Sequence, residues 1–490
     1  MNMLAILIQK ELKAILLSPK FAATFATCAV LILLSIFIGI QDYRAAVRQY
    51  EAAQQLNDQE MREQSSWRVI SSRVYRQPDA MQILVSGVNN DIGRLALVNA
   101  MESIKLRNSS YSDDPIFAVF RFIDFVFIVQ VVLSLFAILF TFDAVNGERE
   151  GGTLKLVFSN AIPRAQYILA KFLGSWLGLV LPLLIPVLLG ILLIMLYRVP
   201  TDNIFWLKVT ALIGMSVLFF TFFIAFGVLM SSLTRNSSVS FLLALVMWVL
   251  FVLIIPRAGV MAAGQIVSVP SVAEIEGQQN GFEKASWDRH MKDMSERWRS
   301  RDAEMEGMSP EQREAYRDEH EWAWLEQEDT ARKTMLKEIN DFSIKLNEDL
   351  RNRKAQQERL GFALSRFSPA SAYQLAAMNL AGTDLTLKTR YEDAMQNYRN
   401  TFTAFTEKKQ KEAGGTGGIR ITVDSDKGFS ISSDRDKGSL DLSELPRFQA
   451  PAHSFADALA PTLMDWGVLA LCTIVAFAGA FVVFLRYDVR

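Results

Sequence analysis

Residues 146–164, with the sequence NGEREGGTLKLVFSNAIPR, lie between two long apolar runs of the chain. The segment is short and polar, and it carries charges of both signs. Charged side chains and loop backbone are costly to bury in the hydrocarbon of a bilayer, so the segment belongs at a membrane surface. We predict a short helical loop that docks against another surface, and the identity of that surface decides the function.

Apolar residues are gathered in separate runs along the chain. The protein has 490 residues, of which 51% are hydrophobic and 21% are charged. A helix of about 20 apolar residues crosses the hydrocarbon core of a bilayer. Runs of this length predict six transmembrane helices, at residues 21–40, 116–142, 172–197, 207–233, 239–255 and 462–485. The predicted fold class is therefore an all-α polytopic membrane protein.

Basic residues near these runs predict the orientation of the chain. With six spans, one face holds Lys10, Lys13, Lys20, Arg149, Lys155, Arg164, Lys171, Arg235, Arg486 and Arg490. Lys and Arg close to spans favour the cytoplasmic face. We therefore expect a multi-pass protein of a bacterial or archaeal cytoplasmic membrane, with both termini and the loop at 143–171 in the cytoplasm. Residues 1–20 should form an amphipathic helix lying on the membrane lipid.

The opposite face carries two longer segments, residues 41–115 and 256–461. The second is long enough for its own core. Ser309-Pro310 with Gln312, and Ser368-Pro369, are typical helix starts, and Gly382 is a typical helix end. Two apolar stripes at helical spacing predict helix-on-helix packing or, as the less favoured alternative, a groove for a partner or ligand. The first stripe is Met335, Ile339, Phe342, Leu346 and Leu350, and the second is Tyr391, Met395, Tyr398, Phe402 and Phe405. The expected extracytoplasmic domain is mainly helical.

Alternating residues at 419–431 predict a small β-meander within this domain. Its connections repeat the pattern Asp-x-Asp-x-Gly at residues 424–428 and 434–438. The pattern matches the start of a calcium loop, but the third acidic ligand and the closing Glu are missing from both copies. Asp and Gly are also favoured in tight turns. We therefore prefer turns to calcium sites.

Several kinds of active site are excluded by the sequence. It contains no phosphate-binding G-x-x-x-x-G-K-[ST] motif, so ATP would not be hydrolysed by that route in this chain. His320-Glu321 begins a zinc-protease signature, but Trp324 stands where the second His is needed. The net charge of −1 gives no bulk attraction for nucleic acid. Cys28 and Cys472 both fall within predicted spans, and we predict no catalytic residue and no metal site.

Arg121 and Asp124 are the charged pair within a predicted span. They lie three residues apart near the outer end of the second span, where they can meet on one helix face. We favour a pair that reaches the membrane interface over a contact with substrate.

The loop resembles the E-R-E-x-G-T-L stretch of ABC-2 type permeases, the membrane subunits of ATP-binding cassette exporters. It is most similar to the group around the permease of the nitrous oxide reductase maturation system. The matching residues are Glu148, Arg149, Glu150, Gly152, Thr153 and Leu154, followed by Pro163 and Arg164. The resemblance implies that these residues form a coupling helix in a cleft of a separate ATPase subunit. The chain departs from short family members in the size of its outer domain.

This resemblance also implies partners and a mechanism. The permease would act as a homodimer, or with a related permease, together with two ATPase subunits that hold ATP and magnesium. The expected function is the permease of an exporter. The alternative is a non-transporting subunit of a cell-envelope machine, in which the outer domain works mechanically on a periplasmic or extracellular protein.

Overall fold

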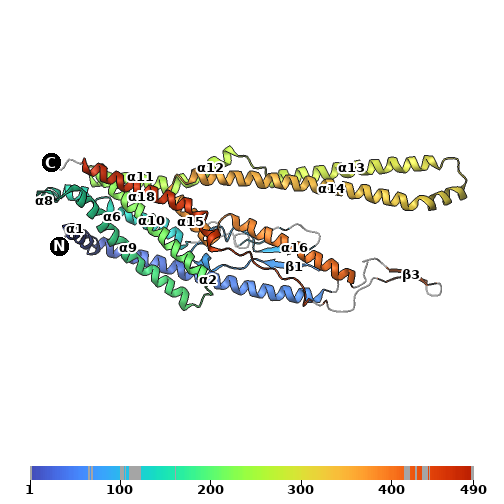
Figure 1. Ribbon diagram of the computed structural model, residues 1–490, viewed down its shortest axis with the longest axis horizontal. Helices are drawn as coiled ribbons and strands as arrows, with labels where there is room; N and C mark the ends of the chain where they lie inside the picture. The colour runs from blue at the N-terminus through green and yellow to red at the C-terminus, as the bar shows by residue number, and fades with distance from the viewer. Residues whose placement is uncertain are drawn as a thin grey trace. The chain divides into compact units, whose positions relative to one another are not determined.

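Helices make up most of the protein, as a computed structural model shows (Figure 1). The described residues are 3–64, 67, 70–99, 104, 106–109, 123–160, 162–412, 420–424, 428–432, 440 and 442–486. Within them, six helices are long and apolar enough to cross a membrane: Pro19–Glu63, Phe125–Glu150, Arg164–Leu196, Asn203–Leu233, Ser237–Ile266 and Thr462–Leu485. The predicted fold class, an all-α polytopic membrane protein with six spans, is confirmed.

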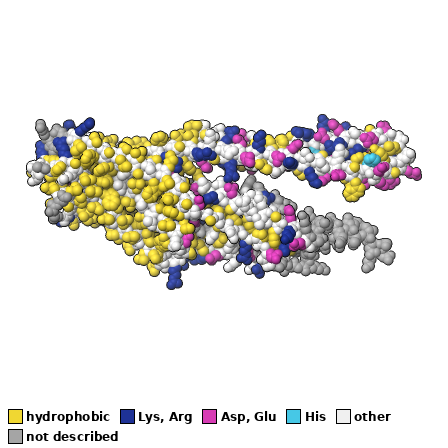
Figure 2. Space-filling model, in the orientation of Figure 1, with side chains coloured by type: hydrophobic (Ala, Val, Ile, Leu, Met, Phe, Trp, Pro, Cys, Tyr) yellow, Lys and Arg dark blue, Asp and Glu magenta, His cyan; other side chains and the backbone are white. Residues whose placement is uncertain are grey.

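The chain forms two compact units. One contains Met1–Ile254 and Ser368–Arg490, and the other contains Ile255–Phe367. The region 256–461, which the sequence led us to treat as a single outer domain, is thus divided between the units. Hydrophobic side chains gather over the helix bundle of the first unit, whereas the second unit shows many charged side chains (Figure 2).

The first unit begins with two helices separated by a cap. Helix α1 covers Met3–Leu16 and α2 covers Pro19–Glu63. The hydroxyl of Ser18 accepts a hydrogen bond from the Phe21 amide, and Pro19 occupies the first helical turn, where its missing N–H costs nothing. Helix α2 continues well beyond the apolar run at 21–40, so the polar residues that follow are part of the same helix.

The other spans of this unit form a bundle around α10. The second span is built from α5 (Phe125–Phe127), the π-helical segment η2 (Ile128–Leu133) and α6 (Ser134–Thr141). The rest are α9 (Arg164–Leu196), α10 (Asn203–Leu233), α11 (Ser237–Val249) with the π-helical segment η3 (Leu250–Ile254), and α18 (Thr462–Leu485). Helix α10 packs against α6, α9, α11 and α18 and is the most buried span.

Helix α15 (Pro369–Ala381) packs against α10 and α18 of the same unit. It begins and ends where the sequence predicts, because Ser368 caps its first turn and Gly382 adopts a left-handed conformation after its last turn. Tyr373 stacks on Phe219 with ring centroids 4.6 Å apart, and its hydroxyl lies 2.9 Å from that of Ser216. This buried contact explains why residues after 368 belong to the bundle unit.

A smaller core lies beyond the bundle in the first unit. Strands β1 (Ser72–Tyr75) and β2 (Leu95–Val98) pair antiparallel, with the 3₁₀-helix η1 (Ala80–Ile83) between them. Helix α16 (Thr386–Glu412) packs on this sheet through its predicted stripe, in which Tyr391, Met395 and Phe402 are buried. The short helix α17 (Phe455–Leu459) precedes α18. The sequence pattern did not predict β1 and β2.

The predicted β-structure near residue 420 is a two-stranded antiparallel hairpin. Strand β3 covers Arg420–Asp424 and β4 covers Gly428–Ser432, with Asp424 opposite Gly428. Asp424 and Gly428 of the first Asp-x-Asp-x-Gly stretch therefore end one strand and begin the next. Residues 425–427 and 433–439, which contain most of the calcium-like pattern, lie outside the described residues.

The second unit is built from three helices, α12 (Ile255–Ile266), α13 (Val272–Glu304) and α14 (Pro310–Ser365). The α13–α14 pair forms a long antiparallel hairpin (Figure 1). Helix α14 starts with the predicted capping box, since Ser309 and Gln312 bond to each other's backbone amides. Phe282 and Phe342 stack across the hairpin with ring centroids 4.1 Å apart.

Candidate functional site

The candidate coupling loop consists of two short helices. Helix α7 covers Asn146–Glu150 and α8 covers Thr153–Ser159. Gly152 joins them with a φ of 71°, in the left-handed region that a side chain disfavours. The loop therefore turns sharply at this glycine, and the two helices point in different directions.

Glu148 is the centre of a charge cluster behind the loop. Its Oε1 accepts hydrogen bonds from the ammonium groups of Lys10, at 2.7 Å, and Lys171, at 2.9 Å. Its Oε2 accepts a hydrogen bond from the Tyr167 hydroxyl at 2.6 Å. Lys171 also donates to Oε1 of Glu11 at 2.7 Å. The cluster joins α1, α7 and α9, three elements that are distant in sequence.

This cluster is largely enclosed by protein. The side chain of Lys171 is 5% exposed, and those of Glu11 and Glu148 are each 13% exposed. Buried charges are tolerated only when they are paired and hydrogen-bonded. One lysine shared by two carboxylates, with Lys10 beside it, meets that requirement.

Glycines let α1 approach α9 closely enough to form the cluster. A Cβ atom on Gly174 would come within 2.5 Å of the Glu11 side chain, and one on Gly178 within 3.3 Å of Ile15. Real Cβ atoms do not approach another atom as closely as 2.5 Å. The absence of a side chain at Gly174 therefore allows Glu11 to reach Lys171.

The loop is also tied to the ends of three spans. Carboxylate oxygens of Glu150 accept hydrogen bonds from the Ser237 amide at 2.8 Å and its hydroxyl at 2.9 Å, at the N-terminus of α11. Asn146 donates to the Thr234 hydroxyl at the end of α10. Arg164 donates to the Leu485 carbonyl at the end of α18, at 2.6 Å. Movement of the loop would therefore act on several spans together.

The outward surface of the loop is formed mainly by α8. Leu154 is buried against Tyr167 and Phe484, which fixes the opposite side of α8. Thr153, Lys155 and Ser159 are exposed, and Leu156 between them has 67% of its surface exposed. A large apolar side chain set among polar residues on a fixed helix is a suitable contact for another protein.

The structure separates the predicted site residues into groups with different surroundings. Glu148 and Leu154 point inward, and Arg149 is half-buried. Glu150 and Arg164 form hydrogen bonds with the ends of other helices. Gly152 supplies the turn between α7 and α8, and Pro163 precedes α9. The Thr153 hydroxyl donates a hydrogen bond to the Glu148 carbonyl. Glu11 and Tyr167 were not predicted as members of the cluster. Lys10 and Lys171 were predicted to mark the cytoplasmic face, and no contact between them and Glu148 was expected.

The predicted Arg121–Asp124 pair lies partly outside the described residues, because Arg121 is among those not described. Asp124 caps α5 by accepting a hydrogen bond from the Phe127 amide at 2.8 Å. Its second carboxylate oxygen accepts from the Ser86 amide and hydroxyl, at 3.0 and 2.9 Å. Asp124 thus links the second span to the segment before β2.

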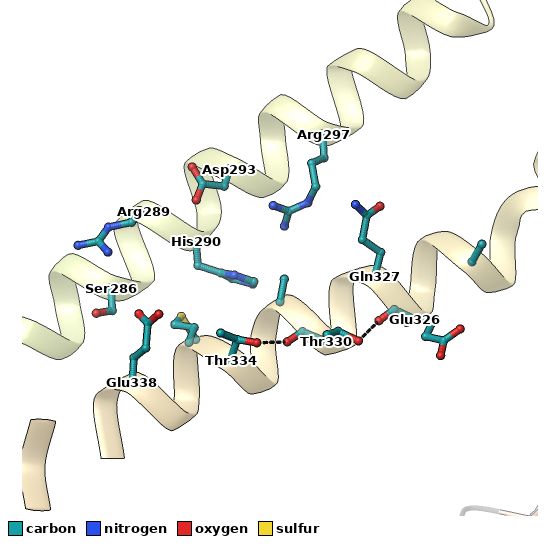
Figure 3. Close-up of a pocket in the computed structure, with 13 residues that line it drawn as sticks. Ser286, Arg289, His290, Asp293, Arg297, Glu326, Gln327, Thr330, Thr334 and Glu338 are labelled. Carbon is teal, nitrogen blue, oxygen red and sulfur yellow. Dashed lines mark hydrogen bonds between the residues drawn. The ribbon is translucent and has the colours of Figure 1, made fainter. Parts of the chain in front are cut away.

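A second candidate site is a cavity of about 650 Å³ between α13 and α14 (Figure 3). Ser286, His290 and Arg297 of α13 face Thr330 and Thr334 of α14 across it. The two threonine hydroxyls donate to carbonyls of their own helix. The cavity is therefore polar, and it lies between two aromatic contacts of the hairpin, Phe282–Phe342 and Trp298–Trp324. In the described part of the chain, no cluster of three or more His, Cys, Asp or Glu is suited to a metal.

A polytopic helix bundle with a charged loop anchored to several spans is the arrangement of a transporter permease. Residues 5–489 match the ABC-2 family transporter proteins, so the chain belongs to that family. It is also similar to the probable ABC transporter permease protein NosY of Stutzerimonas stutzeri, with 36% identity over 125 residues. That match covers 25% of this chain and 45% of the relative, so the chain aligns with less than half of the length of NosY. The protein is a multi-pass membrane subunit of the permease class.

Proposed function

We propose that this permease is driven by a separate ATPase subunit through the α7–α8 loop, and that it exports its substrate. ATP and magnesium would be held in the ATPase, which contacts the outward surface of α8. The observation that carries the proposal is the position of the loop. Its inner side is tied to α1, α9, α10, α11 and α18, while Leu156 is left exposed on its outer side.

The two sides of the loop have separate roles in this mechanism. The ATPase would push on Leu156, Lys155 and Thr153, and the buried cluster around Glu148 would carry the movement to α1 and α9. A binding partner moves a protein from one conformation to another only by binding the second conformation more tightly than the first. Two copies of the permease, or one copy with a related permease, would share a pair of ATPase subunits, with the loop and both termini in the cytoplasm of a bacterial or archaeal cell.

The test is Leu156→Asp, compared with Leu156→Met, in the purified complex with its ATPase. Leu156→Asp places a charge in the contact, so stimulation of ATP hydrolysis by the permease should fall roughly tenfold or more. Leu156→Met keeps an apolar side chain of similar volume and should retain most of the stimulation. Because the side chain is exposed, both variants should be as stable as the parent protein.

Charge reversal at Glu148 and at Arg149 adds a second comparison. Glu148→Lys would place three ammonium groups together and should disturb the fold as well as coupling, whereas Arg149→Glu should act mainly on coupling. If Leu156→Asp and Arg149→Glu, each as a single variant, both stimulated ATP hydrolysis normally, the assignment of this surface to the ATPase would be refuted.

One observation favours a second function, in which the same movement works mechanically on an envelope protein. The Glu150 carboxylate caps α11, and α11 begins the span Ser237–Ile266 that leads in sequence into the α13–α14 hairpin. A deletion of the hairpin discriminates the two. Transport that continues without residues 272–304 and 310–365 would exclude the mechanical function.

A further inference from the structure

Among the described residues, strand β1 pairs only with β2, so one of its two edges has no partner strand. In an antiparallel pair, the N–H and C=O groups of alternate residues point toward the partner strand. The Arg76 amide donates to the Arg94 carbonyl at 2.8 Å, and these two residues continue the β1–β2 register. The backbone groups of Tyr75 and Arg73, one and three residues earlier, therefore point away from β2. We call this side of the strand the outer edge of β1.

The outer edge keeps three backbone groups without a partner. The Arg73 amide donates to Oδ1 of Asn57 on α2 at 2.6 Å, which agrees with the direction of this edge. Within the described parts of the chain, no hydrogen bond is made by the Tyr75 amide or by the carbonyls of Arg73 and Tyr75. Unpaired groups on a strand edge are a template for a further strand. The outer edge therefore offers one donor and two acceptors.

A cavity of about 490 Å³ adjoins the outer edge, in the part of the first unit where β1 lies beside α2 (Figure 1). The residues Ser72–Tyr75 line the cavity, and so does Asn57, which bonds to the outer edge. Another wall is formed by Tyr398 of α16 and by residues between 440 and 448, where the Tyr398 hydroxyl donates to the Pro446 carbonyl at 3.0 Å. We call this cavity the groove. Extended peptides add to a sheet at such an edge, and pockets beside the edge receive alternate side chains.

The groove has an excess of positive charge. Among its lining residues, Arg73 is paired with Glu60. Arg62 and Arg447 also line it, are exposed, and form no ion pair within the described residues. Asp58 is the one acidic residue among the described residues of the lining. Two arginines without counter-charges favour a ligand that carries carboxylates.

We propose that the outer edge of β1 binds an extended, acidic segment of a separate protein, which adds to the sheet as a strand. One residue of the segment would exchange two hydrogen bonds with Tyr75, and the residue two positions further on would donate to the Arg73 carbonyl. Apolar side chains of the segment would pack on Leu445 and Phe448, which are half-buried in the lining of the groove. The segment belongs to another protein because the described chain leaves both the edge and the two arginines without partners. The proposal is independent of the contact with the ATPase.

The first experiment identifies a ligand for the groove. The probe is a library of random eight-residue peptides displayed on phage, and the target is the full-length permease in lipid nanodiscs. Binders that empty nanodiscs do not retain should be enriched in Asp and Glu and poor in Pro, which cannot donate to a sheet. An absence of such binders, or an enrichment of Lys and Arg, would overturn the proposal. The strongest binder, synthesised with a fluorescent label, is the selected peptide of the tests that follow.

Tyr75→Pro tests the backbone contact. It removes the amide of the outer edge and leaves the β1–β2 bonds in place, because proline is tolerated at a strand edge whose N–H faces outward. Tyr75→Ala removes the same side chain and keeps the amide, so it is the matched control. The affinity of the selected peptide, measured by fluorescence anisotropy, should be roughly tenfold lower for Tyr75→Pro than for Tyr75→Ala. Equal affinities would contradict an added strand.

The selected peptide allows the same test without a change in the protein. Methylation of a peptide nitrogen removes one amide donor, and in a strand only alternate amides face the neighbouring edge. Methylation at every second position should therefore weaken binding strongly, and methylation at the positions between should have little effect. A loss of binding that does not alternate would overturn the proposal, even if Tyr75→Pro failed to fold.

Charge reversal tests the preference for an acidic ligand. Arg62→Glu and Arg447→Glu should each lower the affinity of the selected peptide about fivefold or more. Arg48→Glu is the control, because Arg48 is an exposed arginine of α2 outside the groove. It lies about 20 Å from Arg62 along the helix. The same loss in all three variants would indicate a general attraction between net charges and would overturn the proposal.

Hydrogen exchange separates a strand of another protein from one supplied by this chain or by a second copy. The Tyr75 amide should exchange fast in the purified permease and slowly when the selected peptide is bound. Slow exchange without peptide, together with no peptide binding, would show that the edge is already covered and would overturn the proposal. Tyr75→Pro should stimulate ATP hydrolysis normally, so this proposal and the coupling of the loop fail in different measurements.

Discussion

The charges around Glu148 and those of the α13–α14 hairpin use the same residue types in opposite ways. Around Glu148, the partners come from three helices, and Lys171 and Glu11 are 160 residues apart. In the hairpin, pairs such as Asp349 with Arg353 lie one turn apart on a single helix and are open to solvent. A buried pair between distant elements fixes their packing, whereas an exposed local pair reinforces one helix. Sequence composition alone gives no sign of this difference.

The contrast between the two regions predicts the largest effect for removal of Lys171, the lysine shared by Glu11 and Glu148. Lys171→Met leaves the Glu11 and Glu148 carboxylates facing each other without their common cation. The free energy of unfolding should fall by about 3–5 kcal/mol, the usual cost of an uncompensated buried charge. Chemical unfolding of the purified permease in micelles measures it.

Lys13→Met is the control for that variant, because Lys13 is an exposed lysine of α1, the helix that carries Glu11. It should change the free energy of unfolding by less than about 0.5 kcal/mol. Adding Glu11→Gln to Lys171→Met should recover part of the loss. If Lys13→Met and Lys171→Met were equally stable, the cluster would have no special role in packing.

A smaller effect is expected at Glu328, which bridges the two helices of the hairpin. It accepts hydrogen bonds from Nε and Nη2 of Arg297, at 3.1 and 2.7 Å. These bonds lower the pKa of Glu328 from its usual 4.5, so its carboxylate stabilises the hairpin above that pH. The stabilisation is lost as the pH falls through the lowered pKa. Glu328→Gln should therefore cost about 1 kcal/mol or less at pH 7 and nothing in acid.

Hydrogen exchange of the α13 and α14 amides, followed from pH 7 to below pH 4, tests that expectation. The parent protein and Glu328→Gln should differ at neutral pH and converge on acidification. A difference that stays constant over the whole range would show that protonation of Glu328 is not its source.

The smallest effect is expected for the exposed pair on α14. Asp349→Asn removes a partner 2.8 Å from Nε of Arg353. Pairs of this kind contribute about 0.3–0.5 kcal/mol, and salt reduces even that. Exchange rates of nearby amides should change little, and raising the salt concentration should remove the change. A loss comparable to that of Lys171→Met would end the distinction between the two regions.

Local signals in the sequence predicted much of the fold. Apolar runs predicted the six spans, and the caps at Ser309 and Ser368 predicted where two helices begin, because both depend on residues close in the chain. Strands β1 and β2 were missed, since four-residue strands leave little periodicity to detect. The division of residues 256–461 between two units was also missed, because it depends on Tyr373 packing against Phe219 in a span that comes much earlier.

The sequence predicted which segment of the chain forms the candidate site, but it did not predict how the side chains of that segment are arranged. The loop was found because it is a polar segment between apolar runs. The inward direction of Glu148 was not predictable, since it is decided by Lys10 and Lys171, which belong to other helices. Leu156 was overlooked because one leucine in a short helix has no pattern that marks it as exposed.

The closeness of α1 and α9 has a consequence for how the protein is made. Glu11 leaves the ribosome long before Lys171, and the 160 intervening residues take on the order of 10–30 seconds to synthesise. During that interval α1 has neither its cation nor the groove at Gly174 that receives it. The N-terminal helix is therefore among the first parts synthesised and among the last to reach its final place, so a chain truncated before α9 would leave it undocked at the membrane surface.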